Sequence, residues 1–164
     1  MMTLLARHSI AAALAVAVLV VPVAGDAQTR GVSADAPVMW GADTVTYRTN
    51  GVTLEGRAEL LQGDNRMRAN RLTLTTDASG GLSRIEAAGD IYYVTPNETM
   101  RGDSAVYTPA SDTVVISGDV ILTQGENVMT GGRLTYNLRT EQAQMSAGAG
   151  GRVQGVFYPQ RSDR

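Results

Sequence analysis

Apolar and polar positions alternate along most of the chain after residue 50. Every second position is apolar or Gly in three stretches: Val52, Leu54, Gly56, Ala58 and Leu60; Ile85, Ala87, Gly89, Ile91 and Tyr93; Val114, Ile116, Gly118, Val120 and Leu122. The positions between them are mostly Thr, Glu, Arg, Ser and Asp. A period of two is typical of a β-strand that buries one face. We therefore expect three long strands, and the Gly at the centre of each predicts a bend or a bulge.

The strands that follow break the alternation once each. Met67 and Ala69 are at odd-numbered positions, whereas Leu72 and Leu74 are at even-numbered positions. The apolar side chains of such a strand stay on one face only if the strand carries a bulge or a corner. The same change of parity recurs three more times. We predict that the residues at these points take the unusual backbone angles of a bulge, because their types tolerate such angles best: Asp43, Asn70, Asp103 and Gly132.

The chain also repeats itself. Gly56, Gly89 and Gly118 each begin a unit in which Met follows eleven positions later, and the units recur about every 30 residues. Turn-forming residues separate the expected strands at 49–51, 62–65, 77–81, 96–97, 109–112, 125–127 and 138–141. Repeated, kinked antiparallel hairpins of this kind fold into two layers. The predicted fold is therefore all-β, a twisted, open β-jellyroll or β-solenoid with an apolar inner face.

The N-terminal segment has the pattern of a cleaved secretory signal. Arg7 and His8 precede an apolar run from Ile10 to Val21, and Gly25 and Ala27 fit a cut after Ala27. The run is shorter than the roughly 20 residues of a spanning helix, although an uncleaved anchor is the alternative. We thus expect a signal peptide at 1–27, a flexible segment at 28–36, one β-domain at 37–159 and a polar tail at 160–164.

The amino-acid composition excludes several common kinds of catalytic site. The chain has no Cys, and its one His, His8, lies in the expected signal peptide. Ser-His-Asp and Cys-His catalysis and the usual zinc sites are therefore excluded from the mature chain. The net charge of −2 does not indicate the basic surface that is typical of proteins that bind nucleic acid. We expect no enzyme, cofactor or metal.

Two sets of recurring charged residues have competing interpretations. The acids at equivalent repeat positions are Asp43 and Asp103, and Asp90 and Asp119. Because they are copied from hairpin to hairpin, we interpret them as turn or bulge formers rather than as the carboxylate pair of a hydrolase. Arg66, Arg68 and Arg71 are either a solvated rim or contacts for phosphate groups.

The inward-facing positions are the candidate binding site. Many are Met or Tyr beside Ala and Gly, which suits either ordinary packing or an adaptable groove for acyl chains, and the sequence leaves both open. These positions are Trp40, Val45, Tyr47, Val52, Leu54, Leu60, Met67, Leu72, Leu74, Ile85, Ile91, Tyr93, Met100, Tyr107, Val114, Ile116, Val120, Leu122, Met129, Leu134 and Tyr136.

Several segments, in order, resemble the OstA-type domain of the LptA-like lipopolysaccharide transport family. They are Asp43-Thr-Val-Thr-Tyr47, Leu54-x-Gly56, Gly118-Asp-Val-Ile-Leu-Thr-Gln-Gly-Glu-Asn-Val-Met129 and Gly132-Arg-Leu-Thr-Tyr-Asn-Leu138. The resemblance extends over roughly 37–159. It implies an open jellyroll in the periplasm whose apolar groove shields the acyl chains of lipid A.

The same resemblance implies partners. The terminal strands would dock edge to edge with an inner-membrane LptC-like protein and an outer-membrane LptD-like protein, and copies of the chain could assemble head to tail. Two alternatives remain open. The alternatives to an LptA-like transport protein are an LptC-like subunit of the same system and a structural β-solenoid that binds no lipid.

Overall fold

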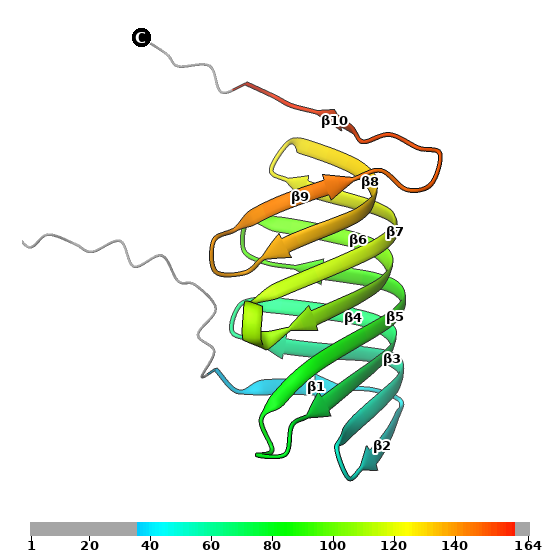
Figure 1. Cartoon of the computed structure of the whole chain (residues 1–164), viewed down its shortest axis with the longest axis vertical. Coiled ribbons are helices and arrows are strands. Elements are labelled where there is room, and N and C mark those ends of the chain that lie inside the picture. The colour runs from blue at the N-terminus through cyan, green and yellow to red at the C-terminus, as the bar shows by residue number, and fades with distance from the viewer. Residues whose placement is uncertain (1–35, 160–164) are drawn as a thin grey trace, which may run out of the picture.

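The computed structural model describes residues 36–159, which form one antiparallel ten-stranded sheet (Figure 1). The strands are β1 (Val38–Gly41), β2 (Thr44–Arg48), β3 (Gly51–Gln62), β4 (Asn65–Thr76), β5 (Leu82–Val94), β6 (Glu98–Thr108), β7 (Thr113–Gln124), β8 (Asn127–Asn137), β9 (Gln142–Ser146) and β10 (Gln154–Val156). A single helical turn, η1 (Pro109–Ser111), lies where the sequence predicts a turn. The predicted open jellyroll of kinked antiparallel hairpins is confirmed.

Each long strand bends near its middle, so the sheet folds into two walls. Every ladder from β3 to β8 shifts register at the bend. The first wall contains 58–62, 65–69, 91–94, 98–102, 120–124 and 127–131, and it is extended by β1 and β10. The second wall contains 51–55, 71–76, 82–88, 104–108, 113–117 and 133–137, and it is extended by β2 and β9.

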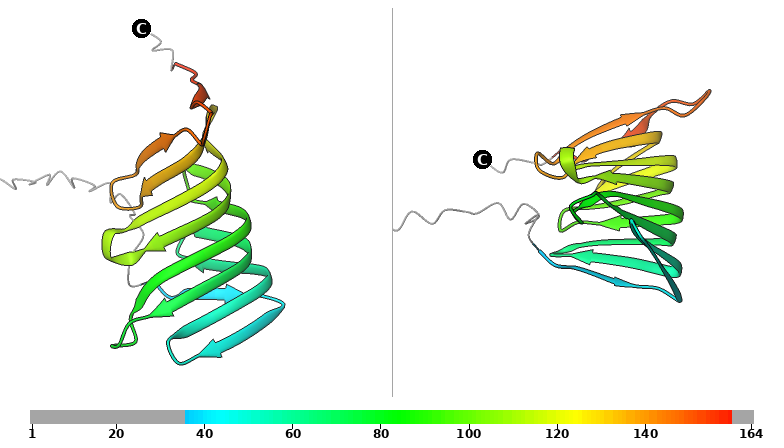
Figure 2. Two further views of the ribbon diagram at one scale, coloured as in Figure 1. Left: turned by 45° about the vertical axis from the view of Figure 1, so that its right-hand side comes forward. Right: turned by 60° about the horizontal axis from the view of Figure 1, so that its bottom comes forward.

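The two sides of this folded sheet differ. The bends lie above one another on one side, at the right of Figure 1, and we call that side the corner. The hairpin connections of both walls lie on the opposite side, which we call the seam. The turned views show the strands stacked along the long axis, with β1 and β2 at one end and β9 and β10 at the other (Figure 2). The walls therefore enclose an interior that runs from end to end.

The corner is built from left-handed backbone in β3, β5 and β7. Its left-handed pairs are Gly56–Arg57, Gly89–Asp90 and Gly118–Asp119. At each bend these strands place two residues opposite one residue of the next strand along the chain, which is a β-bulge. The recurring acids Asp90 and Asp119 are thus confirmed as corner formers.

The prediction for the neighbouring strands was wrong. Asp43, Asn70, Asp103 and Gly132 do not take left-handed angles. The first three instead cover the corner glycines with their side chains. A Cβ atom on Gly118 would lie 2.1 Å from Asp103 Oδ2, and one on Gly89 would lie 2.6 Å from Asn70 Nδ2. These glycines are therefore needed for close approach as well as for backbone angle.

Part of the sequence lies outside the described residues. The predicted signal peptide, nearly all of the 28–36 segment and the polar tail at 160–164 are among these, and the domain boundaries stay predictions. Within residues 36–159, no helix is long and apolar enough to cross a membrane.

Candidate lipid-binding interior

The inward-facing residues form three continuous rows across the strands. The first-wall row is Trp40, Leu60, Met67, Tyr93, Met100, Leu122 and Met129. One second-wall row is Tyr47, Val52, Leu74, Ile85, Tyr107, Val114 and Tyr136, and the other contains Val45, Leu54, Leu72, Ile116 and Leu134. Because directly paired residues point to the same face of a sheet, each row lies on one face. Only Ile91 and Val120 of the predicted site lie outside these rows, next to the corner.

The middle of the interior is closed. Leu54, Leu72, Met100, Ile116 and Leu134 have no exposed surface, and they belong to one apolar cluster that draws on both walls. The other predicted residues between β3 and β8 are buried as well, except for Val52 and Tyr107, which are partly buried, and Met129. The two inner faces therefore pack against each other.

The ends of the interior are open. Trp40, Tyr47 and Met129 belong to the same rows, yet their exposed fractions are 43%, 72% and 37%. Trp40 and Tyr47 are exposed because the sheet ends beside them, and Met129 is followed only by Gly155 of the short strand β10. At the β1–β2 end, the rings of Trp40 and Tyr47 meet edge to face, with their centroids 6.4 Å apart.

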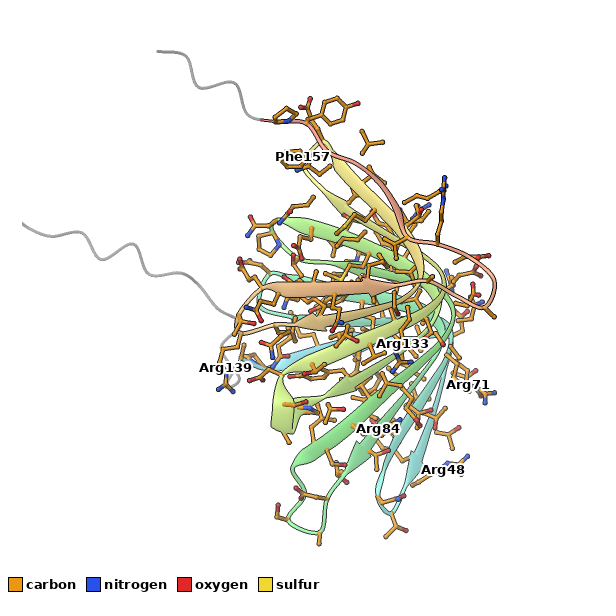
Figure 3. The ribbon with its side chains drawn as sticks, turned by 45° about the horizontal axis from the view of Figure 1, so that its top comes forward. Arg48, Arg71, Arg84, Arg133, Arg139 and Phe157 are labelled. Carbon is orange, nitrogen blue, oxygen red and sulfur yellow. The ribbon has the colours of Figure 1, made fainter. Side chains whose placement is uncertain are left out.

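Exposed large apolar side chains concentrate at these two ends. At the first end they are Met39, Trp40 and Tyr47; at the other they are Met129, Val153, Val156, Phe157 and Tyr158. Within residues 36–159, Ile121 is the one such residue located elsewhere. Figure 3 shows Phe157 beside the terminal strand at the extreme end of the sheet. Surface apolar groups gathered in this way are typical of contact sites.

Glu98 is a buried charged residue that the sequence analysis did not select. It is the first residue of β6, and its exposed fraction is 5%. Its Oε1 accepts a hydrogen bond of 3.0 Å from Gln124 Nε2. Its Oε2 is buried and has no hydrogen-bond partner among the described residues. Glu98 has the same parity as Met100, and this was the one signal that placed it on the inner face.

Burial sets the protonation of this region. Burial raises the pKa of Glu98, Glu141 raises it further, and the hydroxyl of Tyr136 acts in the opposite direction. Burial also raises the pKa values of Tyr93, Tyr107 and Tyr136. Near neutral pH all three tyrosines therefore keep their protons, and the Glu98 carboxyl holds its proton to higher pH than an exposed glutamate does.

The outer faces of the walls carry the arginines. Arg66 pairs with Glu59 and Arg71 pairs with Glu55, whereas the guanidinium of Arg68 lies 5.0 Å from the centre of the Tyr92 ring. Arg71 projects away from the ribbon in Figure 3. All three side chains are exposed on the outside of β4. Exposed ion pairs of this kind add little stability. Because all three arginines lie outside the two walls, their position favours the interpretation as a solvated rim over a phosphate site in the interior.

The architecture defines an open β-jellyroll with a continuous apolar interior. Residues 42–142 match the model of the LptA/(LptD N-terminal domain) LPS transport protein family, which is more than half of the chain. The chain therefore belongs to this family of lipopolysaccharide transport proteins.

Two relatives give the range of similarity. An uncharacterized protein of Rhizobium meliloti (strain 1021) is 27% identical over 139 residues, which cover 78% of this chain and 74% of that protein. The crystal structure of LptH, the LptA-homologous periplasmic component of the lipopolysaccharide transport device of Pseudomonas aeruginosa, superposes with a TM-score of 0.69. That match covers 76% of this chain and 96% of LptH at 19% identity, and it establishes the shared fold.

Proposed function

We propose that this protein carries lipopolysaccharide through the periplasm and shields the acyl chains of lipid A between its two walls. The observation that carries the proposal is the set of apolar rows, which run without interruption from the β1–β2 end to the β9–β10 end. Exposing one acyl chain of a dozen carbons to water costs about 10 kcal/mol, at about 0.8 kcal/mol per methylene. A continuous apolar interior removes that cost along the whole path.

The ends of the sheet suit a bridge between membrane components. Each end combines strand edges with exposed apolar side chains, Trp40 and Tyr47 at one and Val156 and Phe157 at the other. A free edge offers backbone hydrogen bonds to a further strand, and apolar neighbours add buried area. We propose that an LptC-like protein, an LptD-like protein or a second copy of this chain docks there and continues the apolar interior.

A photo-crosslinking residue tests the lipid path. Leu122 is buried in the first-wall row, whereas Thr123 is its outward-facing neighbour on β7. With purified lipopolysaccharide, the crosslinker at 122 should give a lipid adduct and the crosslinker at 123 should not. The closed middle of the interior is what a structural module that binds no lipid would also show. Absence of an adduct at position 122 in a folded protein would favour that second function.

The ends are tested separately by oligomeric state. Trp40→Ala or Phe157→Ala should weaken concentration-dependent self-association, as measured by sedimentation, while the thermal transition stays unchanged. Ile121→Ala is the matched control, because Ile121 is exposed but lies on the outer face between the two ends. An equal effect from all three variants would argue against docking through the ends.

A further inference from the structure

The outer face of the first wall carries two arginines without an acidic partner. Arg68 in β4 and Arg101 in β6 are exposed, and within residues 36–159 neither forms an ion pair. Arg66 and Arg71, which lie on either side of Arg68 in β4, are both paired with glutamates. The guanidinium groups of Arg68 and Arg101 are thus free to bind an external anion.

Tyr92 holds these two cations beside each other. It lies on β5, directly opposite Arg68 of β4 on one side and Arg101 of β6 on the other. The two guanidinium carbons lie 5.0 Å and 5.2 Å from the centre of its ring. A cation within about 6 Å of an aromatic ring is attracted to it. An anion that binds both arginines therefore finds them already positioned, which lowers the entropic cost of binding.

The repeat explains the arginines but not the ring. Arg68 and Arg101 each follow the Met of their repeat unit, so they occupy equivalent positions. The equivalents of Tyr92, three residues after the corner Gly, are Glu59 and Ile121. Each of these has an arginine opposite it on one side only. The aromatic side chain is therefore found at the one of the three positions that has an arginine on both sides.

A hollow of about 410 Å³ contains these groups together with carboxylates of the corner. Asp90 accepts a hydrogen bond of 2.9 Å from Asn70 Nδ2. In the part of the chain that the structure describes, the carboxylates of Asp103 and Asp119 have neither a hydrogen bond nor an ion pair. The hollow therefore presents positive and negative groups that are not paired with each other.

The carboxylates limit which anion fits. They repel a ligand that carries only negative charge and attract one that also has a cationic group. A phosphate offers several oxygens to two guanidinium groups at once, and an ammonium group donates hydrogen bonds to carboxylates. Ile121 also lines the hollow, with an exposed fraction of 37%, and it offers apolar contact to the carbon atoms that join two such groups.

We propose that this outer hollow binds a zwitterionic phosphate of the ethanolamine phosphate type. Its phosphate lies against Arg68 and Arg101, and its ammonium group lies against Asp103 and Asp119. A phospholipid headgroup and a soluble phosphate ester both carry this chemistry. Because the hollow is on the outside of the first wall, the inference goes beyond the proposed lipid path and does not depend on it.

Titration with O-phosphoethanolamine, followed through the NMR signals of Gly102 and Ile121, tests the site. We expect saturable shifts, and Arg68→Gln should weaken the affinity about tenfold, the effect of losing one charge-assisted hydrogen bond. Arg66→Gln is the matched control, because Arg66 is exposed two residues away on the same strand but pairs with Glu59 and does not line the hollow. It should leave the affinity unchanged. Equal weakening by both variants, or no saturable shift in the folded protein, would overturn the proposal.

A second comparison tests the part played by the carboxylates. The original protein should bind O-phosphoethanolamine about tenfold more tightly than inorganic phosphate, which has no ammonium group. Asp119→Asn should reduce this preference, and Asn tolerates the φ of +38° at this position. Equal affinity of the original protein for the two ligands would show that the carboxylates attract no cation, and the zwitterion would then be the wrong ligand.

Vesicles distinguish the two sources of the ligand. Co-sedimentation with phosphatidylcholine vesicles that contain phosphatidylethanolamine, lost in Arg68→Gln, would support a lipid headgroup. Binding of the soluble ester without co-sedimentation would support a free molecule, and binding of neither would overturn the site. The lipopolysaccharide crosslink at position 122 should be the same in Arg68→Gln and in the original protein. Failure of the outer site is therefore distinguishable from failure of the proposed function.

Discussion

At the corner the walls are joined by backbone that bends through left-handed glycines, whereas at the seam the connections join strands within one wall and the walls meet only through packed side chains. The corner leaves no freedom, because Asp103 covers Gly118 so closely that a Cβ atom does not fit. Near the seam, Glu98 Oε2 is buried and has no hydrogen-bond partner within residues 36–159. The comparison teaches that a folded sheet joins its two walls covalently on one side only, so the corner and the seam differ in what holds the walls together.

The largest expected effect is at the corner. Gly118→Ala combines a φ of +81° with a contact of 2.1 Å to Asp103 Oδ2 and one of 2.8 Å to Asp103 Cβ. We expect a loss of about 4 kcal/mol in the free energy of unfolding, measured by urea denaturation. Gly125→Ala is the control, since its φ is +58° and a Cβ there meets nothing within 4 Å. It should cost about 1 kcal/mol, and equal losses would refute the role of close approach.

The second effect is in the interior between corner and seam. Met100→Ala removes a side chain with no exposed surface from the first-wall row, and we expect a loss of about 3 kcal/mol in unfolding free energy. Met129→Ala, two strands away in the same row, is already 37% exposed and should cost less than half as much. Thermal and urea unfolding both measure the difference. Similar losses at the two positions would mean that the interior does not open toward that end.

A smaller effect is expected at the seam. Tyr136→Phe removes the hydroxyl of a buried tyrosine, and the cost should be about 1 kcal/mol of unfolding free energy. A loss as large as that from Gly118→Ala would show that the seam contributes as much to stability as the corner does.

The strands and their inner face were predictable from the sequence because a period of two fixes which side chains share a face. The bulges at Gly56, Gly89 and Gly118 were predicted as well, whereas the second prediction, of left-handed angles in the neighbouring strands, was wrong. Leu54 and Ala58 in β3 are four residues apart, while their partners Leu72 and Ala69 in β4 are three apart. Parity shows that the two strands differ by one residue, but it does not tell which one takes the left-handed angles. The change of parity within β4 suggested that the bulge was in β4, whereas the extra residue is in β3.

Glu98 was missed for a different reason. Its parity matched that of Met100, but its charge argued for an exposed position, and a buried carboxyl is tolerated only through contacts made in the fold. Its hydrogen-bond partner Gln124 is 26 positions away in the chain, on the next strand. No local pattern encodes such a contact. The apolar rows were thus accessible from sequence, and the buried carboxyl beside them was not.

The smallest expected effect is at the seam, where Glu98→Gln should change how the free energy of unfolding depends on pH. Since burial raises the pKa of Glu98, the folded protein holds this proton at pH values where the unfolded chain has lost it. The contribution of Glu98 to stability is therefore fully present below the unfolded pKa and is lost as pH rises through the higher folded value. The glutamine variant does not titrate there. Relative to the original protein, its unfolding free energy should be constant at acid pH and should improve as pH rises.

Urea unfolding of both proteins across that range measures this difference directly. Asp43 and Asp77 have lowered pKa values, so their stability contributions change in the opposite sense, but both are present in each protein and cancel in the comparison. A parallel pair of curves would mean that Glu98 is as well solvated as a surface carboxylate. In that case the seam holds no buried proton, and the interior must be closed by apolar packing alone.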